Sequence, residues 1–207
     1  MISEKFGFVA EFFRSEKPNN VVHTQKEKTS DIARDSGTIC NDYIFRKVWD
    51  YGLDPSLLEF EESELEVSCE IYFAGQTLEK MYPKVYYGIP RKLGMSVESK
   101  KDINIILTEL LLKLFSDGVT WAKLLSMFAI AGSFAVECVR KGYPEHVGVV
   151  TRSIENFVVL HVTDWLVGKG GWEAFHDVVN ERQDRTMMIA FFVFIFLTWL
   201  VIKLSVV

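Results

Sequence analysis

The stretch Val119–Val139, VTWAKLLSMFAIAGSFAVECV, constrains the fold of this chain most. Between Leu124 and Val136 it carries no charged residue, so almost every side of a helix here is hydrophobic. A helix that is apolar all round must be buried. Its thirteen uncharged residues fall short of the about 20 that a membrane span needs, which favours a core helix wrapped by others. The sequence therefore predicts an all-α domain built around this central helix.

Composition narrows the classes of function. Of the 207 residues, 49% are hydrophobic, which is enough for a sizeable core. The net charge of −5 and a pI near 5.5 offer no electrostatic footprint for nucleic acid. Cys40, Cys69 and Cys138 are odd in number and far apart, which favours buried thiols over disulfides or a metal site. Because the sequence shows no metal-ligand spacing, phosphate loop or nucleophile elbow, we expect no enzyme and no cofactor.

Helical spacing organises the first half of the chain. Residues 1–29 are expected to form a flexible N-terminal segment, and residues 30–180 the helical domain. Asp31–Tyr51 places apolar residues at three- and four-residue steps, which predicts the first helix of that domain. A second helix is predicted from Val67 onward. Gly75 lies inside it at a cost of about 1 kcal/mol relative to alanine, which indicates either a close approach of another backbone or a glycine tolerated by chance.

The second half predicts a helical hairpin and a membrane anchor. Val147–Val167 is another long apolar helix, joined to the central one by a tight turn. Met187–Val207 holds a nearly unbroken apolar run whose 21 residues reach about 31 Å, the thickness of a hydrocarbon core. Residues 181–207 are therefore predicted to be a C-terminal membrane anchor, with a buried core helix as the alternative.

Several stretches resemble the B-cell lymphoma two (Bcl-2) family of apoptosis regulators. Leu114–Val139 is similar to its first Bcl-homology (BH) motif, Asp164–Phe175 to the second and Val67–Glu79 to the third. Asp31–Tyr51 resembles the fourth motif more loosely. The runs TWAKLL, VECVRKGYP and KMYPKVYYGIPRKLGMS look most like the Bok, or ovarian-killer, branch of effectors. The resemblance covers the chain from Thr29 to its C-terminus.

The resemblance implies a Bcl-2-like bundle of about eight helices around the central one, plus a C-terminal transmembrane helix. It also implies a hydrophobic groove that receives the third-motif helix of a partner. The implied groove residues are Leu78, Leu107, Leu111, Leu114, Val119, Trp121, Ala122, Lys123, Leu124 and Phe128. The face of this chain's own third motif is Val67, Ile71, Ala74, Gly75, Gln76 and Leu78. The second motif supplies Trp165, Gly170, Gly171 and Trp172, and we expect Trp172 to pack beneath the hairpin.

The function that the resemblance implies is regulation of apoptosis at the mitochondrial outer membrane or the endoplasmic reticulum. A Bok-like effector would oligomerise and permeabilise the membrane, whereas a pro-survival relative would hold third-motif helices of its partners in the groove. The implied partners are Bcl-2-family proteins, membrane lipid and further copies of the chain. Three positions differ from the usual motifs: Gln76 replaces an aspartate, Ala122 a glycine and Lys123 an arginine. An amide and an ammonium make a weaker and less directional contact than the usual aspartate–arginine pair.

Overall fold

The computed structural model describes residues 18–60 and 65–180, and the regular elements of this part of the chain are all helices, without a strand. Its elements are α2 (Pro18–Asp50), the 3-10 turn η1 (Pro55–Leu57), α3 (Glu66–Met81), α4 (Pro83–Tyr86), α5 (Ile89–Lys92), α6 (Lys100–Leu114), α7 (Trp121–Arg140), the 3-10 turn η2 (Pro144–His146), α8 (Val147–His161) and α9 (Thr163–Lys169). Residues 174–180 are helical as well. The all-α fold predicted from the sequence is confirmed.

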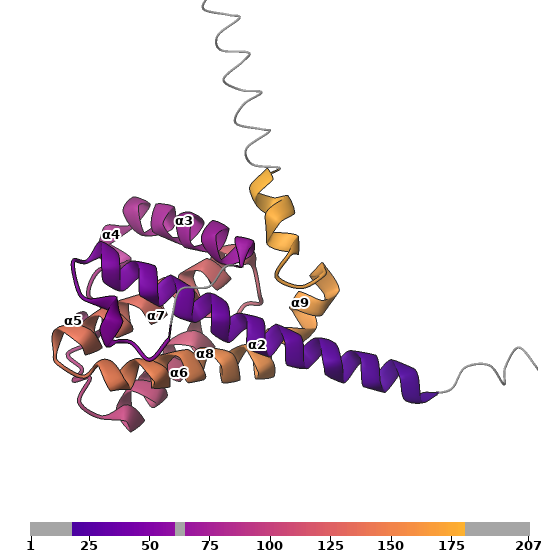
Figure 1. The fold of residues 1–207 in the computed structure, drawn as a ribbon, viewed down its shortest axis with the longest axis horizontal. Coiled ribbons are helices and arrows are strands. Elements are labelled where there is room, and N and C mark those ends of the chain that lie inside the picture. Colours follow the sequence, from indigo (N-terminus) through magenta and orange to yellow (C-terminus); the bar gives the residue numbers. More distant parts are fainter. Residues whose placement is uncertain (1–17, 61–64, 181–207) are drawn as a thin grey trace, which may run out of the picture.

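The central helix of the bundle is α7, as the apolar stretch predicted (Figure 1). Helices α2, α3, α5, α6 and α8 all pack against it. Phe128, Ala131 and Phe134 have no solvent-exposed surface. The Thr120 side chain accepts a hydrogen bond from the Lys123 backbone N–H and so caps the first turn of the helix. Burial of its apolar surface on several sides explains why the helix needs no polar face.

Helix α2 begins at Pro18, so the boundary drawn at residue 29 lies inside a helix. Proline is favoured in the first turn of a helix, because its missing N–H has no partner there in any case. Residues 19–29 contain neither glycine nor proline, so nothing in the local sequence interrupts the helix. The flexible segment expected up to residue 29 is therefore wrong from Pro18 onward.

The predicted helix Val147–Val167 is divided into α8 and α9, which meet at Val162. The Thr163 hydroxyl donates to the carbonyl oxygen of Val158 at 3.0 Å, and in this way competes with the regular helix hydrogen bonds. The single long helix expected here is therefore wrong, although the hairpin of α7 and α8 is present.

Gly170 and Gly171 end α9 with φ angles of 103° and 88°, values that strongly favour glycine. The predicted anchor, Met187–Val207, lies outside the described residues, as do residues 1–17. Within the described part, α7 is the one helix long and apolar enough to cross a membrane, and it is mostly buried.

Candidate partner-binding groove

The third-motif helix, α3, lies with its motif face against α2 and α7. The buried members of that face are Val67, Ile71 and Gly75, and the half-buried members are Ala74, Gln76 and Leu78. Phe73 and Met81, which are not members of that face, are exposed to 58% and 64%. Burial of this face follows from its apolar spacing, because residues three and four apart share one side of a helix. The motif therefore cannot contact a partner unless α3 moves.

Gly75 of α3 lies directly against Tyr43 of α2. A Cβ atom at this position would lie 2.5 Å from the hydroxyl oxygen of Tyr43 and 2.7 Å from its ring. The Tyr43 ring is held on its other sides, since it packs edge-on against Tyr72 at 5.2 Å and stacks on Phe128 at 6.0 Å. The close approach of another backbone, which was one of the two expectations for Gly75, is therefore wrong, because the group that fills this space is the Tyr43 side chain.

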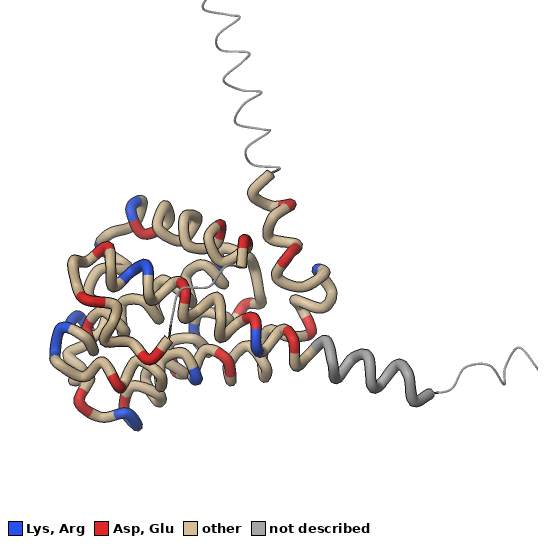
Figure 2. The backbone as a smooth tube through the Cα atoms, in the orientation of Figure 1, with Lys and Arg blue, Asp and Glu red and all other residues tan. Residues whose placement is uncertain are grey.

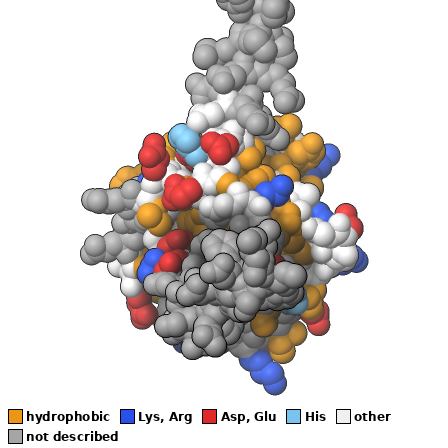
Figure 3. Space-filling view, turned by 90° about the vertical axis from the view of Figure 1, so that its right-hand side faces the viewer, with side chains coloured by type: hydrophobic (Ala, Val, Ile, Leu, Met, Phe, Trp, Pro, Cys, Tyr) orange, Lys and Arg blue, Asp and Glu red, His pale blue; other side chains and the backbone are white. Residues whose placement is uncertain are grey.

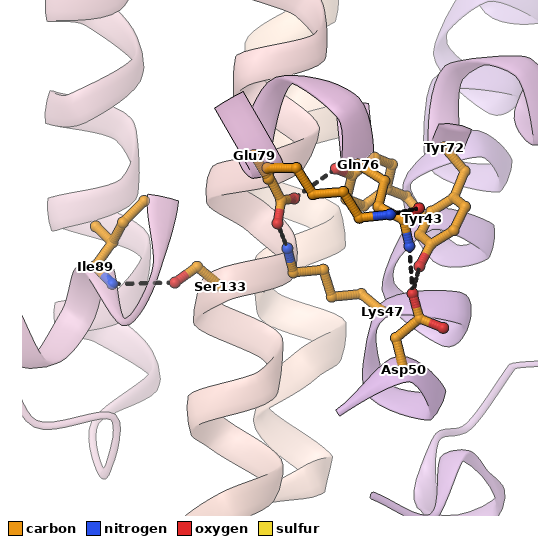
Figure 4. A network of polar contacts seen from close by, with 9 residues as sticks. Tyr43, Lys47, Asp50, Tyr72, Gln76, Glu79, Ile89 and Ser133 are labelled. Atoms are coloured by element: carbon orange, nitrogen blue, oxygen red, sulfur yellow. Dashed lines mark hydrogen bonds and ion pairs between the residues drawn. The ribbon is translucent and has the colours of Figure 1, made fainter. Parts of the chain in front are cut away.

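Polar side chains join α2 to α3 beside this contact (Figure 4). Lys47 on α2 pairs with Glu79 on α3, and the Tyr43 hydroxyl donates to the same carboxylate at 2.7 Å. One turn further along α2, Asp50 accepts hydrogen bonds from the Tyr72 hydroxyl and, at 2.7 Å, from the Gln76 amide. We call these six residues the α2–α3 network. It connects the two helices through charge-assisted hydrogen bonds.

Lys47 is the most buried charged group of the network, with 5% of its surface exposed. Burial lowers the pKa of its ammonium to about 8, against the attraction of Asp50. At neutral pH the group therefore remains mostly protonated and can pair with Glu79. Removing one member of a buried ion pair leaves the other charge without compensation, so this pair makes the position of α3 sensitive to substitution.

The predicted groove residues lie mainly on α6 and α7, but at very different depths. Those with almost no exposed surface are Leu107, Leu111, Leu124 and Phe128. The half-buried ones are Leu78, Leu114, Val119, Trp121 and Lys123, and Ala122 is exposed. In this conformation the first group forms part of the hydrophobic core. Unless the bundle opens, a partner helix can reach only the half-buried residues and Ala122.

Lys123 is engaged at the start of α7. Its ammonium donates to the carbonyl oxygen of Gly118 at 2.8 Å and pairs with the carboxylate of Asp117. The hydrogen bond from Lys123 lowers the pKa of that carboxyl below its usual value. Because Asp117 is 80% exposed, the pair is a surface contact that contributes little to stability. A carboxylate on a partner would compete with Asp117 for Lys123.

The second-motif residues form an aromatic cluster where α7 meets the chain after α9. Trp172 is 3% exposed, and its indole N–H donates to the Ser36 hydroxyl on α2 at 3.1 Å. Trp121 packs against Trp165 and Phe175 at ring distances of 5.0 Å and 5.3 Å. The burial predicted for Trp172 is confirmed. Trp121 was predicted to line the groove, but its ring packs against other aromatic rings of this cluster.

The sequence reasoning missed the charged members of the α2–α3 network, Lys47, Asp50 and Glu79. A signal was present, because Lys47 follows Tyr43 by four residues and so falls on the buried stripe of the first helix. A lysine on such a stripe needs an anionic partner. Glu79 could not be identified as that partner from spacing alone, since it lies 32 residues away in sequence.

Comparisons with known proteins identify the class of protein. Residues 73–172 match the family described as apoptosis regulator proteins, Bcl-2 family. The Bcl-2-related ovarian killer protein homolog B of Danio rerio is 31% identical over 155 residues, which cover 72% of each chain. The chain belongs to the Bcl-2 family of apoptosis regulators. Among its relatives, the human Bcl-2-related ovarian killer protein is 33% identical over 107 residues, 52% of this chain and 50% of the human protein.

Solved structures agree with this assignment. The crystal structure of chicken BOK superimposes with a TM-score of 0.66 at 27% identity, covering 72% of this chain and 97% of that one. A Trichoplax adhaerens protein, trBcl-2L2 bound to trBak BH3, superimposes with a TM-score of 0.61 at 19% identity and covers 70% of this chain and 96% of that one. The likeness to the Trichoplax protein shows that the two chains share a fold.

Proposed function

We propose that this Bcl-2 family protein is a pro-apoptotic effector, which oligomerises and permeabilises the mitochondrial outer membrane after its bundle opens. The observation that carries the proposal is α7. Its 20 residues extend for about 30 Å, the thickness of a hydrocarbon core. The most apolar part of the helix has a mean hydropathy of 1.6 and is 78% buried in the closed bundle. Opening of the bundle would expose a segment that a bilayer can accept.

The second helix of the hairpin needs a conformational change to reach the same length. Helix α8 has 15 residues, or about 22 Å, which is too short to span. Its extension into α9 would require Val162 to become helical and the hydrogen bond between Thr163 and Val158 to be given up. In this proposal α7 spans the membrane first.

Release of α3 is the second step that the proposal requires. Its motif face is turned towards α2 and α7, and the α2–α3 network holds it there. A released α3 could insert into the groove of a second copy of the chain or of another Bcl-2 family protein. The half-buried groove residues around Trp121 and Lys123 are the proposed contact surface.

The residues after the domain are proposed to anchor it. Met187–Val207 is apolar and long enough to span a bilayer, and it would hold the domain on the cytosolic face of the mitochondrial outer membrane or the endoplasmic reticulum. Deletion of this segment should move the protein from the membrane to the soluble fraction of cell lysates. If the shortened chain stayed membrane-bound to the same extent, the anchor would lie elsewhere.

A pro-survival role is the alternative function. It is supported by the fold shared with the Trichoplax protein, which is bound to trBak BH3. In that role the groove would hold the third-motif helix of a partner and no pore would form. The burial of Leu107 and Leu111 favours the effector role, because two predicted groove leucines are not open to a partner in the closed bundle.

Dye release from liposomes tests the two roles directly. The full chain is added to vesicles with the lipid composition of the mitochondrial outer membrane, and the escape of an enclosed dye is measured. An effector releases the dye. A pro-survival protein releases none, and it reduces the release caused by an added effector protein. Overexpression in cultured cells gives the matching result, since the first role kills cells and the second protects them.

A further inference from the structure

One end of the bundle carries a surface that is both basic and apolar. Residues 80–95, KMYPKVYYGIPRKLGM, contain no acidic residue, although the whole chain has a net charge of −5. The cations of this segment are Lys80, Lys84, Arg91 and Lys92. Figure 2 shows several Lys and Arg positions at the end of the bundle that carries α4 and α5, with Asp and Glu of neighbouring elements among them. We call this the 80–95 surface.

Large apolar side chains project from the same surface. Five of the twelve exposed large hydrophobic residues of the described chain lie here. They are Met81, Tyr82, Val85, Tyr87 and Leu93, each with at least 50% of its surface exposed. Isolated exposed hydrophobic residues are ordinary, but a group of them within one short segment marks an interaction site.

The 80–95 surface is held firmly on the bundle. The Tyr86 hydroxyl lies 2.8 Å from the Ser126 hydroxyl of α7, and the Ile89 backbone N–H donates to the Ser133 hydroxyl at 3.1 Å (Figure 4). Pro90 is buried beside them. These contacts attach α4 and α5 to α7. The exposed side chains of residues 80–95 therefore lie on the face that is turned to solvent.

Of the four cations of this surface, Arg91 alone pairs with a carboxylate among the described residues. The acids lining the hollow beside it are Asp50, which accepts from Tyr72 and Gln76, and Glu79, which pairs with Lys47. Arg91 pairs with Glu137. Within the described residues, Lys84 and Lys92 have no carboxylate partner, and the Lys92 ammonium donates to the Lys84 carbonyl oxygen at 2.6 Å. Hydrogen bonds from Arg91 and Arg140 lower the pKa of Tyr87, as expected in a positive field.

We propose that the 80–95 surface docks on the anionic face of a lipid bilayer while the bundle is still closed. Lysine and arginine are attracted to anionic headgroups, and tyrosine and aliphatic side chains enter the boundary between headgroups and acyl chains. The face at the opposite end carries Asp and Glu side chains among its Lys, Arg and hydrophobic ones (Figure 3). Because residues 80–95 contain no acidic residue, docking through them would orient the domain with α4 and α5 towards the lipid.

An anionic bilayer fits this surface better than an acidic protein or a nucleic acid. The exposed side chains include Met81, Val85 and Leu93, which can enter lipid but make no hydrogen bond with a phosphate backbone. Apart from the consecutive Arg91 and Lys92, the cations of this segment are separated in sequence by apolar residues. Such docking does not depend on whether the protein kills or protects cells, so its failure would leave the proposed effector function untouched.

A fluorescent probe at the surface itself tests the proposal in the full chain. An environment-sensitive dye is attached to Val85→Cys, with Cys69→Ser to remove the partly exposed native thiol. We expect a blue shift on vesicles of equimolar phosphatidylcholine and phosphatidylserine, and none on phosphatidylcholine alone. Each cation near such a surface contributes roughly fivefold to binding. Lys84→Glu with Lys92→Glu should therefore raise the lipid concentration for a half-maximal shift at least about thirtyfold.

Matched variants separate this contact from other effects. Lys113→Glu with Arg152→Glu makes the same change in net charge at exposed positions outside the 80–95 surface and should leave the shift in place. The same dye at Leu160→Cys, which is 74% exposed on α8, should remain in water. Lys84→Gln with Lys92→Gln, which adds no negative charge, should give a smaller loss. The proposal is overturned if the dye at residue 85 does not shift on anionic vesicles that carry the bound protein, or shifts equally on neutral ones.

Discussion

The pair of Lys47 and Glu79 should dominate the attachment of α3 to α2. Lys47→Met keeps most of the side-chain volume but removes the charge. Among the described residues, the Glu79 carboxylate then keeps the Tyr43 hydroxyl as its hydrogen-bond donor. The Glu79 side chain is 13% exposed, so water replaces the ammonium poorly. Breaking a buried pair on one side costs about 3–5 kcal/mol. We expect a loss of this size in the free energy of unfolding.

A double substitution makes that expectation specific to the pair. Lys47→Met with Glu79→Leu removes both charges, and such replacements are close to neutral or stabilising. Urea unfolding of the full chain, followed by circular dichroism, measures the two single variants, Lys47→Met and Glu79→Leu, and the double variant. Arg34→Met is the control, because its pair with Asp31 is 3.1 Å long but well exposed, and it should cost less than about 1 kcal/mol. If the double variant lost as much as the two single losses added together, the coupling would be absent and our reasoning wrong.

Three further substitutions test other contacts. Gly75→Ala should destabilise the domain by about 1–3 kcal/mol in urea unfolding, because its Cβ would overlap Tyr43; Gly148→Ala, with nothing within 4 Å, should not. Trp172→Ala should cost about 3–5 kcal/mol, and an unchanged thermal midpoint would show that the indole is not packed. The Glu70 carboxylate, 2.6 Å from His176, raises the pKa of that imidazole. Because the folded pKa is the higher one, this stabilisation is present below about pH 6.5 and disappears as the pH rises through the folded pKa; His176→Gln should remove that pH dependence from hydrogen exchange in α3.

The helices with a clear apolar face could be predicted from sequence because their burial is decided by spacing. The first helix has such a pattern, whereas the central helix α7 could be predicted because it is apolar on almost every side. The two errors have local causes. Residues 18–29 contain only two aliphatic residues, Val21 and Val22, which are adjacent, so the sequence carries no amphipathic signal there. The break at Val162 depends on one threonine hydroxyl, and threonine is found inside helices as well as at their ends.

The candidate site was less predictable, because its chemistry depends on which helix faces which. Spacing placed Gly75 and Gln76 on one helix face, but it could not show that Tyr43 fills the space left by the glycine or that Asp50 accepts from the amide. The amide is therefore already used within the chain. In the usual family motif, the side chain at the position of Gln76 would face the arginine of a partner. In this chain the Gln76 amide donates to Asp50 instead, and so helps to hold α3 in its own bundle. Any partner that takes α3 must first replace the hydrogen bonds of the α2–α3 network, and this requirement favours a change of conformation before binding.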